Sequence, residues 1–145
     1  MEKQNYNVDF LTYLSNNENK EQNNLYNFAV DTLVFSAKVQ IWHWSCNSGF
    51  HHERLENIYN ILREFSDELV EITLSMEQKF NITTKNYTIN NEPFELQKAL
   101  TKLSNYIAEL LNIKNEYSTK ISLDSLISDT ISKLEKEVGL LKNFS

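Results

Sequence analysis

The chain has 145 residues, 41% of them hydrophobic and 23% charged, a balance typical of one globular domain rather than of a disordered or membrane-embedded chain. Fourteen basic and twenty acidic residues give a formal net charge of −6. Because this charge opposes sequence-independent binding to a phosphate backbone, DNA is not expected as a partner.

Residues 1–22 are predicted to form an amino-terminal arm, because they are rich in Asn, Gln, Glu and Lys and contain one apolar stretch, 10–14, that suits a short helix. Residues 23–145 are predicted to form the folded domain. Its first helix is expected to begin at Asn24 and to end near Gly49, where a left-handed glycine would close it. The predicted core stripe of this helix contains Leu25, Phe28, Ala29, Thr32, Leu33, Phe35, Ser36, Val39, Gln40 and His43.

The second helix is predicted to run from His51 to Lys79, a length on the order of 40 Å. Residues 81–91 lack a helical period and are expected to form a crossover. Pro93 suits the first turn of a third helix, and a fourth helix is expected from Ser122. Four helices with one longer link after the second predict an all-α, ferritin-like four-helix bundle with one crossover between the second and third helices.

Several features of the composition exclude other classes. The single cysteine, Cys46, excludes an internal disulfide and a thiolate-rich zinc site. Two glycines and one proline are few for a strand-rich fold, whose turns use both. No apolar run approaches the roughly 20 residues that cross a bilayer, and the first ten residues lack the order of a signal peptide. We therefore expect a cytoplasmic protein without a membrane partner.

Two pairs of side chains on the second helix have the spacing of metal ligands. His52 and Glu56 are four residues apart, as are Asp67 and Glu71, so each pair shares a helix face and can grip one cation. The pairs lie about 22 Å apart along the axis, too far for one metal centre. If two such helices pack antiparallel about a two-fold axis, the first pair of one chain meets the second pair of the other, and two identical sites result.

His43 lies nine residues before His52, across a short turn, and can supply a further ligand. Imidazole and carboxylate groups without thiolates suit iron and other divalent first-row metals. His51 is an alternative to His52, although its offset of about 100° points it away from Glu56. The carboxylates also have an ordinary alternative interpretation, as the solvated face of a surface helix.

The segments His43-Trp44, Gly49-Phe50, His52-x-x-x-Glu56 and Asp67-x-x-x-Glu71 together resemble the Dps family, the miniferritins, and also the ferritin-like proteins of large phages and viruses. The resemblance covers the region 36–76. It implies a ferroxidase site between subunits, with His43, His52, Glu56, Asp67 and Glu71 as iron ligands.

The resemblance also implies an activity and an assembly. Two ferrous ions per site would be oxidised by hydrogen peroxide or oxygen, and ferric mineral would be stored inside a closed shell of identical subunits. A phage or viral member would act in the host cytoplasm. Trp42 and Trp44 could then donate electrons near the iron, although packing is the ordinary role of such residues.

Two other functions fit the same pattern. The first is a ferritin-like protein that binds metal without turnover, for example as a structural component of phage or viral origin. The second is a helical module whose charged face binds a partner protein.

Overall fold

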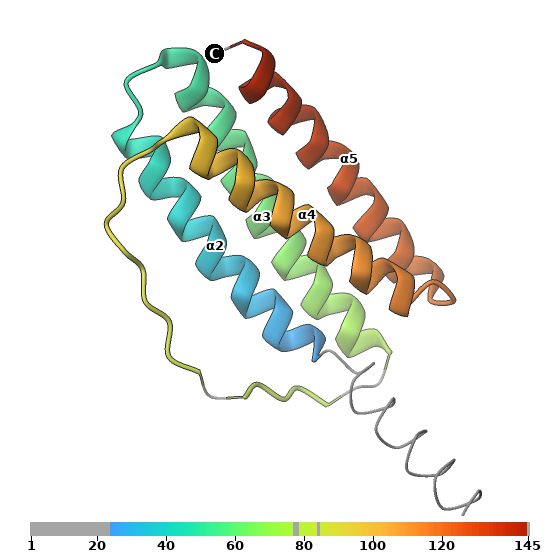
Figure 1. Ribbon diagram of the computed structural model, residues 1–145. Coiled ribbons are helices and arrows are strands. Elements are labelled where there is room, and N and C mark those ends of the chain that lie inside the picture. The colour runs from blue at the N-terminus through green and yellow to red at the C-terminus, as the bar shows by residue number, and fades with distance from the viewer. Residues whose placement is uncertain (1–23, 77–78, 84, 145) are drawn as a thin grey trace, which may run out of the picture.

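The computed structural model of the protein describes residues 24–76, 79–83 and 85–144, so the predicted arm lies outside the described residues. Four helices pack as a bundle, as Figure 1 shows, and the predicted all-α class is confirmed. The helices are α2 (Leu25–Ser45), α3 (Gly49–Ser75), α4 (Leu96–Glu116) and α5 (Ile121–Asn143). Helix α3 packs against both α2 and α5, and α4 packs against α5. None of the described helices is long and apolar enough to cross a membrane.

Side chains cap the starts of α2 and α3. Asn24 caps α2, because its Oδ1 accepts hydrogen bonds from the backbone N–H groups of Tyr26 and Asn27 at 3.0 and 3.2 Å. Ser48 caps α3 by accepting a hydrogen bond from the His51 N–H at 3.3 Å. The prediction that Gly49 closes the first helix is therefore wrong. Gly49 is instead the first residue of α3, because the serine cap before it starts a new helix.

Two other predicted helix ends are also wrong. Helix α3 ends at Ser75 rather than Lys79, and the Met76 N–H bonds back to the Ile72 carbonyl at 3.1 Å. Helix α4 begins at Leu96, so Pro93 precedes its first turn. The backbone N–H of Phe94 donates to Ser45 Oγ at 2.8 Å, so the residue after the proline is bound to the end of α2.

The core lies between the four helices and contains one apolar face of each. Its fully buried members include Leu25, Val39, Leu55, Ile58, Leu62, Phe65, Leu69, Leu103, Leu110, Leu123, Ile127, Leu134 and Leu141. Leu33, which the sequence placed in this core, is 48% exposed. It follows the buried Thr32 by one residue, about 100° around the helix, and this rotation carries it outside the core stripe.

The link between α3 and α4 is attached to α2 at several points. Near the start of α2, Asn24 Nδ2 donates to the Asn81 carbonyl at 2.7 Å. Further along, the Tyr87 hydroxyl donates to Asp31 Oδ1 at 2.6 Å. With the Ser45 bond at the other end, the described parts of the link follow α2 over its length, as Figure 1 shows.

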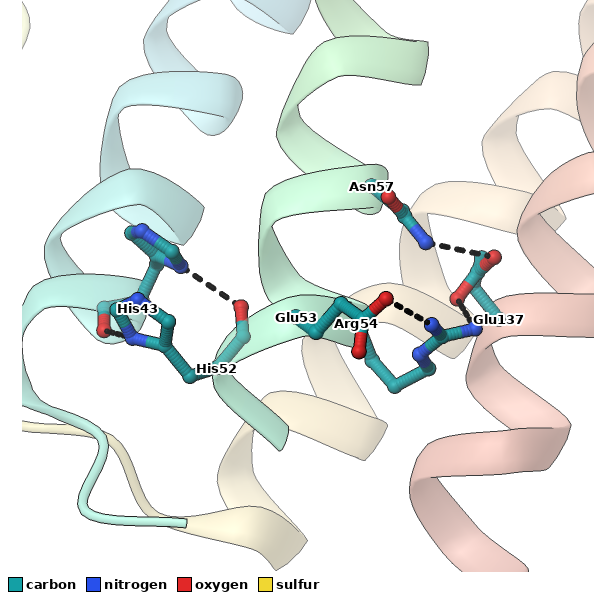
Figure 2. Close-up of polar contacts among 6 residues, drawn as sticks. All are labelled: His43, His52, Glu53, Arg54, Asn57 and Glu137. Carbon is teal, nitrogen blue, oxygen red and sulfur yellow. Dashed lines mark hydrogen bonds and ion pairs between the residues drawn. The ribbon is translucent and has the colours of Figure 1, made fainter. Parts of the chain in front are cut away.

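A polar cluster joins α3 to α5 inside the bundle, as Figure 2 shows. Glu137, which is only 7% exposed, accepts a hydrogen bond from Asn57 Nδ2 at 3.3 Å. Its other carboxylate oxygen lies 3.3 Å from Arg54 Nη1, and the same guanidinium lies 3.2 Å from Glu53. The buried carboxylate is therefore paired with a cation and fixes α3 against α5.

Candidate metal site

The last turn of α2 faces the first turn of α3 through a pair of stacked histidine rings. The ring centroids of His43 and His52 lie 3.5 Å apart, and the ring planes differ by 25°. His43 Nδ1 donates to the His52 carbonyl, and His52 Nδ1 donates to the His43 carbonyl, both at 2.7 Å (Figure 2). Each ring is thus held by the backbone of the other residue.

These reciprocal hydrogen bonds define the free atom of each ring. A carbonyl oxygen only accepts, so both Nδ1 atoms must carry a hydrogen. A neutral ring of this kind has its lone pair on Nε2, and a metal-binding histidine is commonly oriented by such an Nδ1–H bond to a carbonyl. The pair therefore offers two oriented imidazole donors.

The stacking also limits how the two donors can be used. An imidazole lone pair lies in the plane of its ring, and lone pairs in nearly parallel planes do not converge on one point. The stacked rings are therefore not arranged to chelate one cation together.

Tyr59, Arg63 and Gln40 form a chain of contacts that starts at the pair, and none of them was assigned as a ligand from the sequence. Tyr59 presents its ring edge-on to His43, with centroids 5.4 Å apart. The Arg63 guanidinium lies 4.9 Å from the centre of the Tyr59 ring and donates a hydrogen bond to Gln40 Oε1. Two of them had a visible signal in the sequence: Tyr59 belongs to the resemblance to the phage and viral ferritin-like proteins, and Arg63 lies on the same face of the helix as the predicted ligands.

Within one chain, the three predicted carboxylate ligands do not form a metal-holding group with the histidine pair, although Glu56 lies one helical turn after His52. Glu56, Asp67 and Glu71 are exposed on the outward face of α3. Across residues 24–76, 79–83 and 85–144, no three His, Cys, Asp or Glu side chains are grouped so that they could hold a metal ion. Of the five predicted ligands, the structure thus brings together only the two histidines.

His51 has a different environment from His52. It is 8% exposed, its ring meets Phe94 with centroids 5.6 Å apart, and its Nε2 has no hydrogen-bond partner among the described residues. It contributes to packing at the end of the bundle, which favours His52 as the candidate ligand.

The two tryptophans also differ. Trp42 is buried and packs edge-on against Phe35, with centroids 6.1 Å apart, so the packing interpretation is correct for it. Trp44 is 68% exposed, and the same interpretation is wrong for this residue in the single chain.

The Glu137 cluster was not expected from the sequence, although a signal was present. Glu137 is three or four residues from Leu134 and Leu141, and with Thr130 these residues lie on the buried face of α5. A carboxylate in such a register requires a buried cationic or hydrogen-bonding partner. Arg54 and Asn57 meet this requirement.

No protein-family model matches the chain, and neither a curated protein nor a solved structure matches it. Its function is therefore inferred from the chemistry of the residues themselves.

Proposed function

We propose that the protein is a ferritin-like subunit of the Dps type that binds Fe(II) at a dinuclear site between two chains, oxidises it, and stores or detoxifies the product. The observation that carries the proposal is the reciprocal His43–His52 pair, which leaves two Nε2 lone pairs for metal. The link along α2 supports the ferritin-like class, because joining α3 to α4 over the length of the bundle is what a crossover does.

The exposure of the carboxylates supports a site made by two chains. Glu56, Asp67 and Glu71 are exposed on α3, as residues that meet a second copy must be. In an antiparallel pair of α3 helices, each site takes His43, His52 and Glu56 from one chain, with the Asp67 and Glu71 positions supplied by the other chain. A closed homo-oligomeric shell built from such pairs would hold the ferric product.

The ligand set suits both oxidation states of the substrate. Imidazole nitrogen binds Fe(II) without excess charge, and carboxylate oxygens stabilise the higher charge of Fe(III). Each Fe(II) gives up one electron, so one hydrogen peroxide, which takes two electrons and two protons to become two waters, oxidises one pair of ions. Other divalent first-row metals fit the same donors.

Variants of single ligands test the site. Fe(II) is added without oxygen, its binding is measured by calorimetry, and peroxide is then added while ferric absorbance is followed. We expect His52→Ala and Asp67→Ala each to weaken binding by about tenfold or more, as loss of a metal ligand or its support does. Glu68→Ala is the matched control, since Glu68 is exposed beside Asp67 and is not a proposed ligand. Wild-type oxidation rates in both ligand variants would show that the ligands are wrongly assigned.

Mixing the two inactive variants tests whether the site is shared. In a dimer of one His52→Ala chain and one Asp67→Ala chain, both substitutions fall in the same site and the other site is intact. Random exchange of chains should therefore restore about a quarter of the wild-type sites. No recovery after confirmed exchange would exclude the two-chain site.

The same measurements separate the two alternative functions. Metal that binds and stabilises the protein without being oxidised would indicate a non-catalytic metal-binding or structural protein. A chain that takes up no metal would be a helical interaction module.

A further inference from the structure

A hollow of about 400 Å³ lies on the side of the bundle between α2 and α4, and this volume is in the range of small-molecule sites. Helices α2 and α4 do not pack closely against each other, whereas α2 packs on α3 and α4 packs on α5. Each of the two helices contributes an acid, an aromatic ring and a lysine from one of its faces. They are Asp31, Phe35 and Lys38 on α2, and Glu109, Tyr106 and Lys102 on α4.

The middle of the hollow is aromatic. The ring centroids of Phe35 and Tyr106 lie 5.1 Å apart, and the ring planes differ by 34°. Tyr106 is buried, and its hydroxyl shares a hydrogen bond of 2.7 Å with Thr32 Oγ1, which fixes the ring from the core side. Phe35 is only half-buried, so the two rings leave an apolar surface on which a flat molecule can lie.

The two ends of the hollow carry opposite charges. Because α2 and α4 run in opposite directions (Figure 1), the lysine of one helix lies at the same end as the lysine of the other. Lys38 and Lys102 both also line a small hollow beside Trp42. Asp31 and Glu109 both also line a hollow near the start of α2. Like charges therefore face each other, with two ammonium groups at one end and two carboxylates at the other.

The acidic end is only partly neutralised by the chain. Asp31 accepts a hydrogen bond from the Tyr87 hydroxyl at 2.6 Å and lies 3.6 Å from Lys85 Nζ. Glu109 forms no ion pair with any residue that the structure describes. Partial desolvation, followed by the negative charge of Asp31, raises the pKa of Glu109, and Lys85 offsets only part of this effect. A cation between the two carboxylates would stabilise the charged form of Glu109.

The basic end has the matching arrangement. Lys102 Nζ lies 3.3 Å from Glu92 Oε2, whereas Lys38 forms no ion pair within residues 24–76, 79–83 and 85–144. Lys38 is half-buried, and a charged group that loses water without gaining a partner is destabilised. An anionic group between the two lysines would supply that partner.

We propose that this hollow binds a small zwitterion with an ammonium group at one end, a flat apolar body, and a carboxylate at the other end. The ammonium group lies between the two acids, the body lies on the Phe35 and Tyr106 rings, and the carboxylate lies between the two lysines. The site contains none of the five proposed metal ligands, so the proposal is independent of iron binding.

The spacing of the charges selects among zwitterions. On each helix the acid and the lysine are seven residues apart, about 10 Å along the axis. A ligand with its charges at opposite ends, such as an aromatic amino carboxylate or a dipeptide, spans this distance better than an α-amino acid, whose two charged groups share one carbon. A dianion or a dication is disfavoured, because one of its ends would meet like charges.

Calorimetry with para-aminomethylbenzoate tests the proposal, on the full chain and with chelator present so that metal binding does not contribute. This probe has an ammonium group and a carboxylate at opposite ends of one ring. We expect para-methylbenzoate, which lacks the ammonium group, and para-methylbenzylamine, which lacks the carboxylate, each to bind about tenfold more weakly. Phenylalanine, whose charges are adjacent, should be weakened similarly. Equal affinity for the probe and either single-charge analogue would overturn the proposal, as would no binding of the probe at millimolar concentration.

Charge variants of the protein locate the two ends of the ligand. Lys38→Gln should weaken binding of the probe and of para-methylbenzoate by about three- to tenfold and leave para-methylbenzylamine unchanged. Glu109→Gln should have the opposite selectivity. Lys136→Gln and Glu135→Gln, at exposed positions of α5 outside the hollow, are the matched controls. Unchanged binding in both Lys38→Gln and Glu109→Gln would place the probe elsewhere and overturn the site.

Discussion

At the His43–His52 pair, each ring nitrogen has a role that follows from its neighbours. The Nδ1 atoms donate to carbonyl groups at 2.7 Å, and the Nε2 atoms are left for other partners. Each ring is held by the backbone carbonyl of the other residue and stacked on its ring. Replacing one histidine by Ala is therefore expected to remove the stacking contact but to leave the carbonyl that accepts the hydrogen bond of the remaining Nδ1.

The tautomers of these rings are a direct prediction. Because both Nδ1 atoms face carbonyl oxygens, we expect the neutral ring of both His43 and His52 to carry its hydrogen on Nδ1. Long-range ¹H–¹⁵N spectra would then show an unprotonated Nε2 on each ring. His51, which makes neither carbonyl bond, serves as the internal comparison. A protonated Nε2 on either ring of the pair would contradict the hydrogen-bond arrangement.

Sequence reasoning reached this site only in part. The nine-residue separation and the short turn indicated that His43 and His52 are neighbours, and helical spacing placed Glu56, Asp67 and Glu71 on one face. It could not predict the ring stacking or the role of each nitrogen, because these depend on side-chain rotation and on two carbonyl positions. Whether the carboxylates join the histidines stays a prediction, since it requires a second chain.

At the scale of helices, their number and order were predictable because the apolar residues recur over long stretches. The ends were less predictable, since local hydrogen bonds decide them. Gly49 could equally end one helix or begin the next, and the Ser48 cap decides the outcome. Pro93 suited a first turn, but the Ser45 bond to Phe94 holds this segment outside α4.

The contact between α3 and α5 predicts that removal of one buried carboxylate, Glu137, lowers the free energy of unfolding strongly. Glu137→Ala would leave Arg54, whose side chain is only 16% exposed, without its buried partner. We expect the free energy of unfolding in urea to fall by about 2 to 3 kcal/mol. Asp129→Ala on the same helix breaks an exposed ion pair with Lys133 and should cost about 0.5 kcal/mol or less. Equal losses of unfolding free energy in the two variants would show that the buried ion pair stabilises the fold no more than the exposed one.

The link between α3 and α4 is predicted to make the stability of the fold depend on pH in the alkaline range. The hydrogen bond to the Asp31 carboxylate, then desolvation and the negative charge of Asp31, raise the pKa of Tyr87 from 10.0 to about 12. The folded state therefore favours the protonated phenol, so this stabilisation is fully present below pH 10 and is lost as the pH rises through about 12.

Comparison with Tyr87→Phe isolates this contribution. Wild type should lose more stability than the variant between pH 10 and about 12, as measured by urea unfolding at each pH. The pKa of Tyr106 is also raised, by burial, but this residue is common to both proteins and cancels in the difference. Parallel curves for the two proteins would show that the Asp31 bond does not hold the link.

At the scale of the molecule, one apolar stripe per helix predicts a bundle, and the four helices form one. The outward position of Leu33 escaped the sequence analysis, which assigned this residue to the core. Only the three-dimensional arrangement separates an inward apolar residue from an outward one when a helix is apolar on both faces.

The charge distribution predicts weak interaction with nucleic acid. Lys38, Lys85 and Lys102 line a hollow of about 400 Å³ between α2 and α4, but Asp31 and Glu109 line it as well. With a net charge of −6, the protein should not retard duplex DNA in a gel at about 0.15 M salt. Retardation that weakens steeply with added salt would contradict this prediction.

The three-residue turn between α2 and α3 has a consequence for folding kinetics. Residues in contact across this turn, such as His43 and His52, are close in sequence, so little chain entropy is lost when they meet. Helical hairpins with such local contacts form in microseconds to milliseconds, before segments distant in sequence dock. The His43–His52 pair is therefore expected to form together with the α2–α3 hairpin, before the four-helix bundle is complete.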